Sequence, residues 1–160
     1  MRWIALTLVA LLAAVAPAAA AAVDGASDRD LWATVNVCNT ATHPREIGIR
    51  GSMPALGRRA GMYMRFRAQY RDPVTGRWRY VRGADSGWRR AGTERTRTLE
   101  SGWSFELDRK GQTILRGVVR YEWRRAGRVL RSARRATEGG HRSTAGADPE
   151  DFSAATCRID

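Results

Sequence analysis

Apolar and polar residues alternate in short runs along the chain after residue 30, with the period of two that is typical of a β-strand buried on one face. In the clearest run, Met62, Met64 and Phe66 alternate with Tyr63 and Arg65. No stretch shows the 3.6-residue period of an amphipathic helix, so the pattern predicts an all-β fold. The predicted strands cover residues 31–38, 46–53, 62–71, 77–82, 95–99, 103–107, 112–125 and 128–136.

Turn sequences separate these predicted strands. Residues 72–76 read Asp-Pro-Val-Thr-Gly, in which proline presets φ and glycine accepts a positive φ, so a hairpin is expected there. Ala126 and Gly127 form the turn of a second hairpin. Its returning strand, 128–136, alternates weakly and is expected at a sheet edge. Residues 138–151 are rich in Gly, Ser, Asp and Pro, which predicts a long surface loop.

Seven or eight short antiparallel strands with turns between them predict a two-sheet β-sandwich, with a small β-barrel as the alternative. In strand number and spacing, residues 31–159 resemble the immunoglobulin-like and fibronectin-III-like domains of exported bacterial proteins. The resemblance implies a fold and no activity. In that family the third and sixth strands are neighbours in one sheet, and residues 62–71 and 112–125 are expected to take those two roles here. The family's tryptophan on the third strand is replaced here by Phe66, and Cys157 lies near the end of the chain.

The N-terminal segment, residues 1–22, has the three parts of a cleavable signal peptide. Arg2 gives a positive start, residues 3–16 are apolar, and small residues offer cleavage near Ala22. A retained membrane anchor is the alternative, but an apolar run of about 14 residues is short for a spanning helix, which needs about 20. Cleavage leaves a tail over residues 23–30 and a single domain from residue 31 to residue 160, in a secreted or periplasmic protein.

The chain has two cysteines, Cys38 and Cys157. In an oxidising compartment such a pair is most simply one disulfide. Closing a loop of about 120 residues stabilises a fold by roughly 4–5 kcal/mol in the chain-entropy model. Two free thiols or an intermolecular bridge are the alternatives. Because there is no Cys-x-x-Cys sequence and no third soft ligand, neither a redox site nor a metal site is predicted.

The net charge is the feature of the sequence that says most about function. The chain carries a net charge of +12, and all but one of its 28 basic residues are arginine, Lys110 being the exception. The codon usage of a GC-rich bacterial genome explains arginine over lysine, but not the excess over anions. Like charges opposite each other destabilise a sheet, and arginine suits phosphate, sulfate or carboxylate groups. A solvated basic surface is the alternative. The arginines predicted to bind anions on one outer face, including its extension across the first hairpin, are Arg65, Arg67, Arg71, Arg77, Arg79, Arg116, Arg120 and Arg124.

Tryptophans give a second set of candidates. Trp78, Trp103 and Trp123 fall on the apolar faces of their strands, which predicts core packing, with a carbohydrate-binding platform as the alternative. Trp88 lies in a loop-like Ser-Gly-Trp-Arg-Arg segment and is the best candidate for an exposed aromatic ring. Trp32 is out of phase with its apolar neighbours and is a second candidate.

Catalytic signatures are absent from the sequence. His43 and His141 both lie in turn-like contexts without a nucleophile motif, which predicts exposed turn residues. Asp148, Glu150 and Asp151 cluster around a proline, which is typical of a flexible acidic loop, although such a cluster also suits a bound cation. No catalytic residue, metal ligand or cofactor is therefore predicted.

The predicted function is that of an exported, non-enzymatic binding module whose basic face holds an anionic envelope polymer. Teichoic-type phosphates, acidic polysaccharide and extracellular DNA all match the charge, and binding to DNA would be electrostatic rather than sequence-specific. One alternative is a protein-interaction domain that uses loops or an edge strand. Another is a small-molecule carrier or an unrecognised hydrolase, which would need an apolar cleft. The oligomeric state is not predicted.

Overall fold

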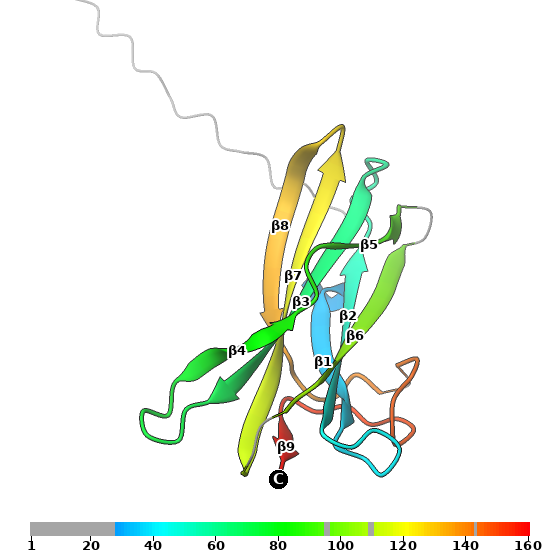
Figure 1. The fold of residues 1–160 in the computed structure, drawn as a ribbon. Helices are drawn as coiled ribbons and strands as arrows, with labels where there is room; N and C mark the ends of the chain where they lie inside the picture. Colours follow the sequence, from blue (N-terminus) through cyan, green and yellow to red (C-terminus); the bar gives the residue numbers. More distant parts are fainter. Residues whose placement is uncertain (1–27, 95–96, 109–110, 143) are drawn as a thin grey trace, which may run out of the picture.

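The computed structural model describes residues 28–94, 97–108, 111–142 and 144–160 (Figure 1). The predicted signal peptide, residues 1–22, and the tail as far as residue 27 lie outside the described residues. Within the described ranges, no helix is long and apolar enough to cross a membrane.

Two antiparallel sheets make up the fold, as the alternation predicts (Figure 1). The smaller sheet has the strand order β1-β2-β6, and the larger has the order β4-β3-β7-β8, with β5 added to β3 and β9 added to β7. Among the described strands no pair joins the two sheets, so the fold is an open sandwich rather than a closed barrel. The strands are β1 (Trp32–Cys38), β2 (Glu46–Pro54), β3 (Gly61–Arg71), β4 (Trp78–Asp85), β5 (Arg89–Thr93), β6 (Thr98–Glu106), β7 (Thr113–Arg125), β8 (Arg128–Ala136) and β9 (Cys157–Ile159), after a short 3-10 turn over Asp28–Asp30.

The core lies between the sheets and is built from the apolar phase of the alternating strands. Met62, Met64 and Phe66 of β3 are fully buried there, and so is Trp123 of β7. The Trp123 indole Nε1 donates a hydrogen bond to the Pro54 carbonyl oxygen at 2.8 Å. This bond crosses from the larger sheet to the smaller one and satisfies a buried polar group.

A second bond between the sheets comes from Tyr121, whose hydroxyl donates to the carbonyl oxygen of Trp32 at 2.5 Å. Burial raises the pKa of the Tyr121 phenol, so it remains a neutral donor. Gly51 leaves room for this phenol, because a Cβ there would lie 2.6 Å from the hydroxyl oxygen. The absence of a side chain at Gly51 therefore allows the two sheets to approach closely at Tyr121.

The predicted disulfide between Cys38 and Cys157 is present, with the two Cα atoms 5.3 Å apart. Cys38 ends β1 in the smaller sheet, whereas Cys157 begins β9, which pairs with β7 in the larger sheet. The bond therefore ties the two sheets together at one end of the sandwich.

Two details of the strand prediction are wrong. Residues 86–90 were expected to form a loop, but β5 starts at Arg89 and pairs with β3. With β5 and the short β9 added, the described residues form nine strands. Residues 95 and 96 of the predicted strand over 95–99 lie outside the described residues, and Thr98 and Leu99 belong to β6, which continues through the predicted strand over 103–107 as far as Glu106. Both segments lie at sheet edges with mixed exposure, so they lack the alternation from which a strand is recognised.

Apart from residue 143, which lies outside the described residues, the long segment over 138–151 is a loop, as predicted, and it runs beside β1, an edge strand of the smaller sheet. Asp148 forms a bridge to Val37, and shortly after the loop Ala154 pairs with Val35. The arginines gather elsewhere, on the outer face of the larger sheet.

Candidate anion-binding face

The outer face of the larger sheet is called here the basic face. Strand register builds it, because residues paired directly across an antiparallel sheet project from the same side. Arg65 of β3 pairs with Arg120 of β7, which in turn pairs with Arg134 of β8. Three arginines therefore lie in one row across three neighbouring strands. The residues that form the basic face are Tyr63, Arg65, Arg67, Gln69, Trp78, Tyr80, Asp85, Trp88, Arg116, Val118, Arg120, Glu122, Arg124, Arg134 and Ala136.

Most of the predicted arginines share this face, but two do not. Arg79 pairs with Tyr70, whose phase on β3 is that of the core, so Arg79 projects from the opposite side of β4. There its Nε lies 2.9 Å from the Asp72 carboxylate. Arg77 lies in the turn before β4 and is exposed. The extension across the hairpin predicted from the sequence is therefore wrong. The predicted arginines that the structure places on the basic face are Arg65, Arg67, Arg116, Arg120 and Arg124, with Arg71 at its border beside Trp78.

Aromatic rings separate the arginines on this face. The Arg67 guanidinium carbon lies 3.5 Å from the centre of the Tyr80 ring, and that of Arg116 lies 4.3 Å from the centre of the Trp78 ring. Arg124 lies over Trp88 at 4.7 Å. Contacts of this kind attract a cation to the face of a ring and hold the guanidinium plane in place.

The tryptophans differ from the prediction. Trp123 is in the core as expected, but Trp78 is half-buried on the basic face and Trp103 is 37% exposed. Trp103 pairs with Ile49 and so has the core phase, yet β6 is an edge strand and the ring stays partly exposed, with the Arg89 guanidinium carbon 3.9 Å from its centre. Alternation gives the direction of a side chain, but it does not show whether a second layer covers it.

The two candidates for exposed rings are both half-buried. Trp88 lies beside Arg124 and, at 5.8 Å, Arg120. Trp32 stacks on the His141 ring with centroids 4.3 Å apart. Trp88 is thus part of the basic face, whereas Trp32 lies elsewhere.

Carboxylates neutralise one half of the basic face, which we call the paired half: Arg65, Arg67, Arg124, Asp85 and Glu122. Arg65 donates two hydrogen bonds to Asp85, from Nε at 2.8 Å and from Nη2 at 2.5 Å. Arg67 Nε lies 3.2 Å from the same carboxylate, and Arg124 Nη2 lies 2.6 Å from Glu122. Hydrogen bonding to Arg65 lowers the pKa of Asp85, and the same bonds raise the pKa of Arg65.

The other half, called the unpaired half, consists of Arg116, Arg120 and Arg134. No described carboxylate lies within ion-pair distance of any of them. Arg116 Nε donates to a neutral acceptor, Gln69 Oε1, at 2.9 Å. Burial lowers the pKa of Arg116, and the nearby charge of Arg134 lowers it further. The like charges of Arg116 and Arg134 therefore act on each other without a counter-ion from the described chain.

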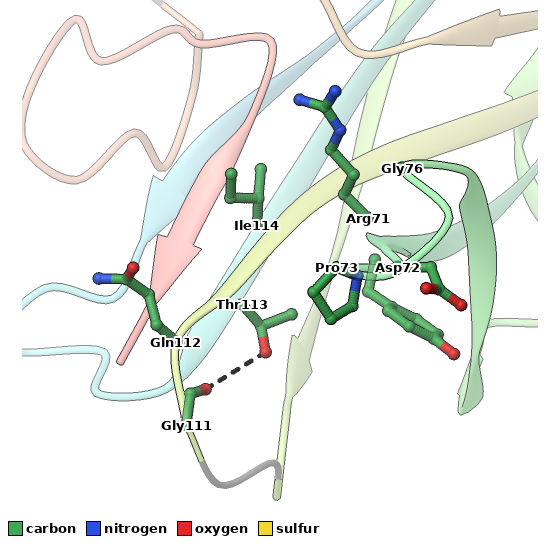
Figure 2. Close-up of a pocket in the computed structure, with 9 residues that line it drawn as sticks. Arg71, Asp72, Pro73, Gly76, Gly111, Gln112, Thr113 and Ile114 are labelled. Carbon is green, nitrogen blue, oxygen red and sulfur yellow. Dashed lines mark hydrogen bonds between the residues drawn. The ribbon is translucent and has the colours of Figure 1, made fainter.

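A surface hollow of about 540 Å³ lies beside this face, between the β3–β4 turn and the start of β7 (Figure 2). Its carboxylate, Asp72, accepts hydrogen bonds from the backbone N–H groups of Thr75 and Val74, both at 3.0 Å. These bonds, that of Thr75 foremost, lower the pKa of Asp72, and Arg79 lowers it further. Asp72 therefore holds the turn, and none of the residues that line the hollow forms a nucleophile–base pair.

The two histidines contact carboxylates and are half-buried rather than exposed. His43 Nδ1 lies 3.2 Å from Glu46 Oε2, and its Nε2 lies 4.0 Å from Asp148 Oδ2. His141 Nε2 lies 3.1 Å from Glu138. Neither histidine contacts the basic face.

A flexible acidic loop was expected around Asp148, but this residue is held by hydrogen bonds. The hydroxyls of Thr40 and Thr42 donate to Asp148 and lower its pKa, Thr40 having the larger effect. Glu150 is exposed. Across the described ranges, no three His, Cys, Asp or Glu side chains lie close enough together to hold a metal ion.

Arg134 is the member of the unpaired half that the sequence pattern does not single out. The register of β8 is shifted by a bulge between Trp123 and Arg124, and its alternation is weak. The signal that points to Arg134 is the hairpin itself, because a strand that returns from Gly127 must lie beside β7.

No protein-family model, no curated protein and no solved structure matches this chain. The likeness to immunoglobulin-like and fibronectin-III-like domains remains a prediction from strand number and spacing. A functional conclusion therefore rests on the basic face itself.

Proposed function

We propose that this protein is an exported, non-enzymatic binding module that holds an anionic polymer of the cell envelope on its basic face. The observation that carries the proposal is the unpaired half. Arg120 and Arg134 face each other across β7 and β8, with Arg116 on the same face, and all three lack a carboxylate partner among the described residues. Export is supported by the predicted signal peptide and by the disulfide, a bond typical of oxidising compartments.

Electrostatics explains why such a surface favours an anion. Like charges opposite each other on a sheet repel, and each anion that binds between them removes part of that repulsion. A ligand that binds only the folded state also stabilises it. Because counter-ions are released when arginines bind a polyanion, the affinity should fall steeply with salt.

The layout of the face favours an extended ligand. Arg116 and Arg120 are four residues apart on β7, which places them about 13 Å apart along the strand, while Arg134 is one strand away, about 5 Å. The aromatic faces nearby are already covered by guanidinium groups, as Trp78 is by Arg116. Binding by charge is therefore favoured over stacking of bases or sugars on these rings.

A protein-interaction domain is the second candidate, and one observation favours it. The edge strand β8 leaves Val129 52% exposed and Leu130 41% exposed. Exposed apolar residues on an open edge are suited to pairing with a strand of another protein. A complex that forms with one protein and does not weaken with salt would support this alternative.

The experiment that tests the proposal is a charge reversal of the unpaired half. The double variant Arg120→Glu/Arg134→Glu changes two exposed side chains, and Arg97→Glu/Arg142→Glu makes the same change in net charge at exposed positions away from the face. Affinity for dextran sulfate and for isolated cell envelopes is measured across a sodium chloride series. We expect the first variant to bind about a hundredfold more weakly at low salt, and its log–log salt slope to fall by about two, the number of contacts removed.

The control variant distinguishes binding at the basic face from binding that follows net charge alone. If both double variants lose affinity equally, binding follows net charge and the basic face is not the site. If the unaltered protein does not bind either material at low salt, the proposed function is wrong.

A further inference from the structure

A second hollow of the surface, called here the arginine hollow, lies at one end of the basic face beside the β7–β8 turn. It has a volume of about 470 Å³. The start of β3 and the end of β7 meet there, because Gly61 pairs with Arg124 (Figure 1). Arginines from three separate segments line it, namely the loop before β3, strand β5 and the end of β7. These arginines are Arg59, Arg90, Arg124 and Arg125.

Gly61 leaves the space for this hollow. In its row across the larger sheet it lies between Thr93 of β5 and Arg124 of β7. Because the side chains of one row project from the same side, a residue without a side chain leaves a depression between its neighbours. Tyr63 leans over this depression, since a Cβ at Gly61 would lie 3.0 Å from Tyr63 Cε2 and 3.5 Å from its hydroxyl oxygen. That hydroxyl forms no hydrogen bond with a described residue, so it is free to donate to a ligand.

The positive charges of the arginine hollow are not balanced by the chain. Of the described residues that line it, only Glu122 carries a carboxylate, and this group lies 2.6 Å from Arg124 Nη2. The Arg124 guanidinium carbon also lies 4.5 Å from the centre of the Tyr63 ring, so this arginine is a fixed wall. The other three arginines are exposed, and within the described ranges no carboxylate lies at ion-pair distance from them. An external anion can therefore neutralise three charges here.

The dimensions of the hollow indicate which kind of anion fits. Its volume falls in the range of about 300–1,000 Å³ that is typical of small-molecule sites, and it exceeds what a single phosphate group fills. Because the free arginines come from three segments, a ligand reaches several of them only if its charge is spread over neighbouring groups. Ala126 and Gly127 of the turn bound the hollow on one side, which suits a compact ligand better than the middle of an extended chain.

We infer that the arginine hollow is a second binding site, separate from the unpaired half, for a compact oligoanion. Such a ligand carries three or more negative charges on neighbouring phosphate or carboxylate groups. Arg59, Arg90 and Arg125 supply charged donors, and the Tyr63 hydroxyl supplies a neutral one. Arg125 lies five residues beyond Arg120 on β7, about 17 Å along the strand, so a ligand of this size does not reach both sites.

The test measures binding of three small probes to the protein by isothermal titration calorimetry at low salt: tripolyphosphate, citrate and orthophosphate. The variant Arg90→Gln/Arg125→Gln removes two charges from the hollow, and Arg97→Gln/Arg142→Gln removes two exposed charges elsewhere. Thermal unfolding checks that each variant is folded. Arg59 is left unchanged because its φ of 52° is unusual for a residue with a side chain, and a substitution there would also alter the backbone.

We expect tripolyphosphate or citrate to bind about tenfold more tightly than orthophosphate, because each has more charged groups for the arginines to reach. The variant altered at 90 and 125 should lose about tenfold in affinity for that probe, while the control changes little. Tyr63→Phe, which removes the hydroxyl alone, should lose about threefold. Tighter binding of tripolyphosphate would assign the site to phosphate groups, and tighter binding of citrate would assign it to carboxylates.

A third double variant, Arg120→Gln/Arg134→Gln, shows whether the hollow is a separate site. It should keep its affinity for the small probe. If it loses as much as the variant altered at 90 and 125, the probe binds the unpaired half and the inference is wrong. Equal losses in the control, equal binding of all three probes, or no binding at low salt would also overturn it. The proposed function is tested with polymers and does not depend on these outcomes.

Discussion

The paired and unpaired halves of the basic face arrange the same side chain in opposite ways. In the paired half, Arg65 and Arg67 share Asp85, and the pKa of Arg65 rises. In the unpaired half, Arg116 has a neutral partner and its pKa falls. Arginine content by itself is therefore a poor guide to a binding surface. What matters is which guanidinium groups the chain leaves without a counter-ion.

The largest effect on stability is expected in the paired half, when its shared carboxylate is removed. Asp85→Asn leaves Arg65 and Arg67 facing each other's charge without compensation, and we expect a loss of about 1–3 kcal/mol in the free energy of unfolding. Urea unfolding measures it. Affinity for dextran sulfate should rise, because the paired half then resembles the unpaired one.

Glu100→Gln provides the control, since Glu100 lies 3.5 Å from Arg50 and its side chain is 40% exposed, against 27% for Asp85. It should cost only about 0.5 kcal/mol. Equal losses for Asp85→Asn and Glu100→Gln would mean that the paired half contributes no more than an ordinary surface ion pair.

Acid should have a somewhat smaller effect of the same origin. The folded-state pKa of Asp85 is lowered, so its contribution to stability is fully present above the unfolded value of about 4 and is lost as pH falls through the lower folded value. Because solvent reaches this pair, we expect about 1 kcal/mol or less. Urea unfolding between pH 5 and pH 2 should show a shallower decline for Asp85→Asn than for the unaltered protein. Identical declines would show that Asp85 does not contribute to the loss of stability in acid.

The smallest effect is expected when a carboxylate is added to the unpaired half. Ala136 pairs with Val118 and so lies on the basic face, two residues from Arg134. Ala136→Glu supplies an internal counter-ion, and we expect unfolding to cost about 0.5 kcal/mol more. Affinity for dextran sulfate should fall at the same time, with Ala136→Gln as the uncharged control. A glutamate variant that binds as tightly as the glutamine variant would contradict the placement of the ligand.

The sequence predicts much of the basic face because β3 and β7 alternate cleanly. Their phase assigns Arg65 and Arg120 to the outer side, and the sandwich architecture places the two strands side by side. The disulfide follows from having only two cysteines. These features depend on local pattern or on simple counting, which a sequence records directly.

The pairing of charges depends on details that local patterns do not record. A hairpin closed at the 72–76 turn aligns Gln69 with Tyr80, and continuing that register would place Arg67 opposite Arg82. A register shift between Arg67 and Gln69 instead brings Asp85 opposite Arg67. Gly83, with a φ of 80°, lies within the shifted segment of β4. The counter-ion of the paired half was therefore not predictable from the alternation.

The burial of tryptophans shows the same limit in another form. Trp78 lies on the hairpin of β3 and β4, which extends beyond the smaller sheet (Figure 1). It alternates in phase with Tyr80, which suggests a core position, but the register places it on the outer face, where Arg116 lies over its ring. Whether a ring enters the core depends on the facing layer, which belongs to a distant part of the chain.

In the proposed function, an anionic polymer binds the unpaired half. The most direct measurement follows the Nε–Hε resonances of the arginines by nuclear magnetic resonance during titration with dextran sulfate oligomers. We expect the resonances of Arg116, Arg120 and Arg134 to shift at the lowest ligand concentrations, while those of Arg65 and Arg124 change little. Shifts of equal size across both halves, or shifts confined to arginines outside the basic face, would contradict it.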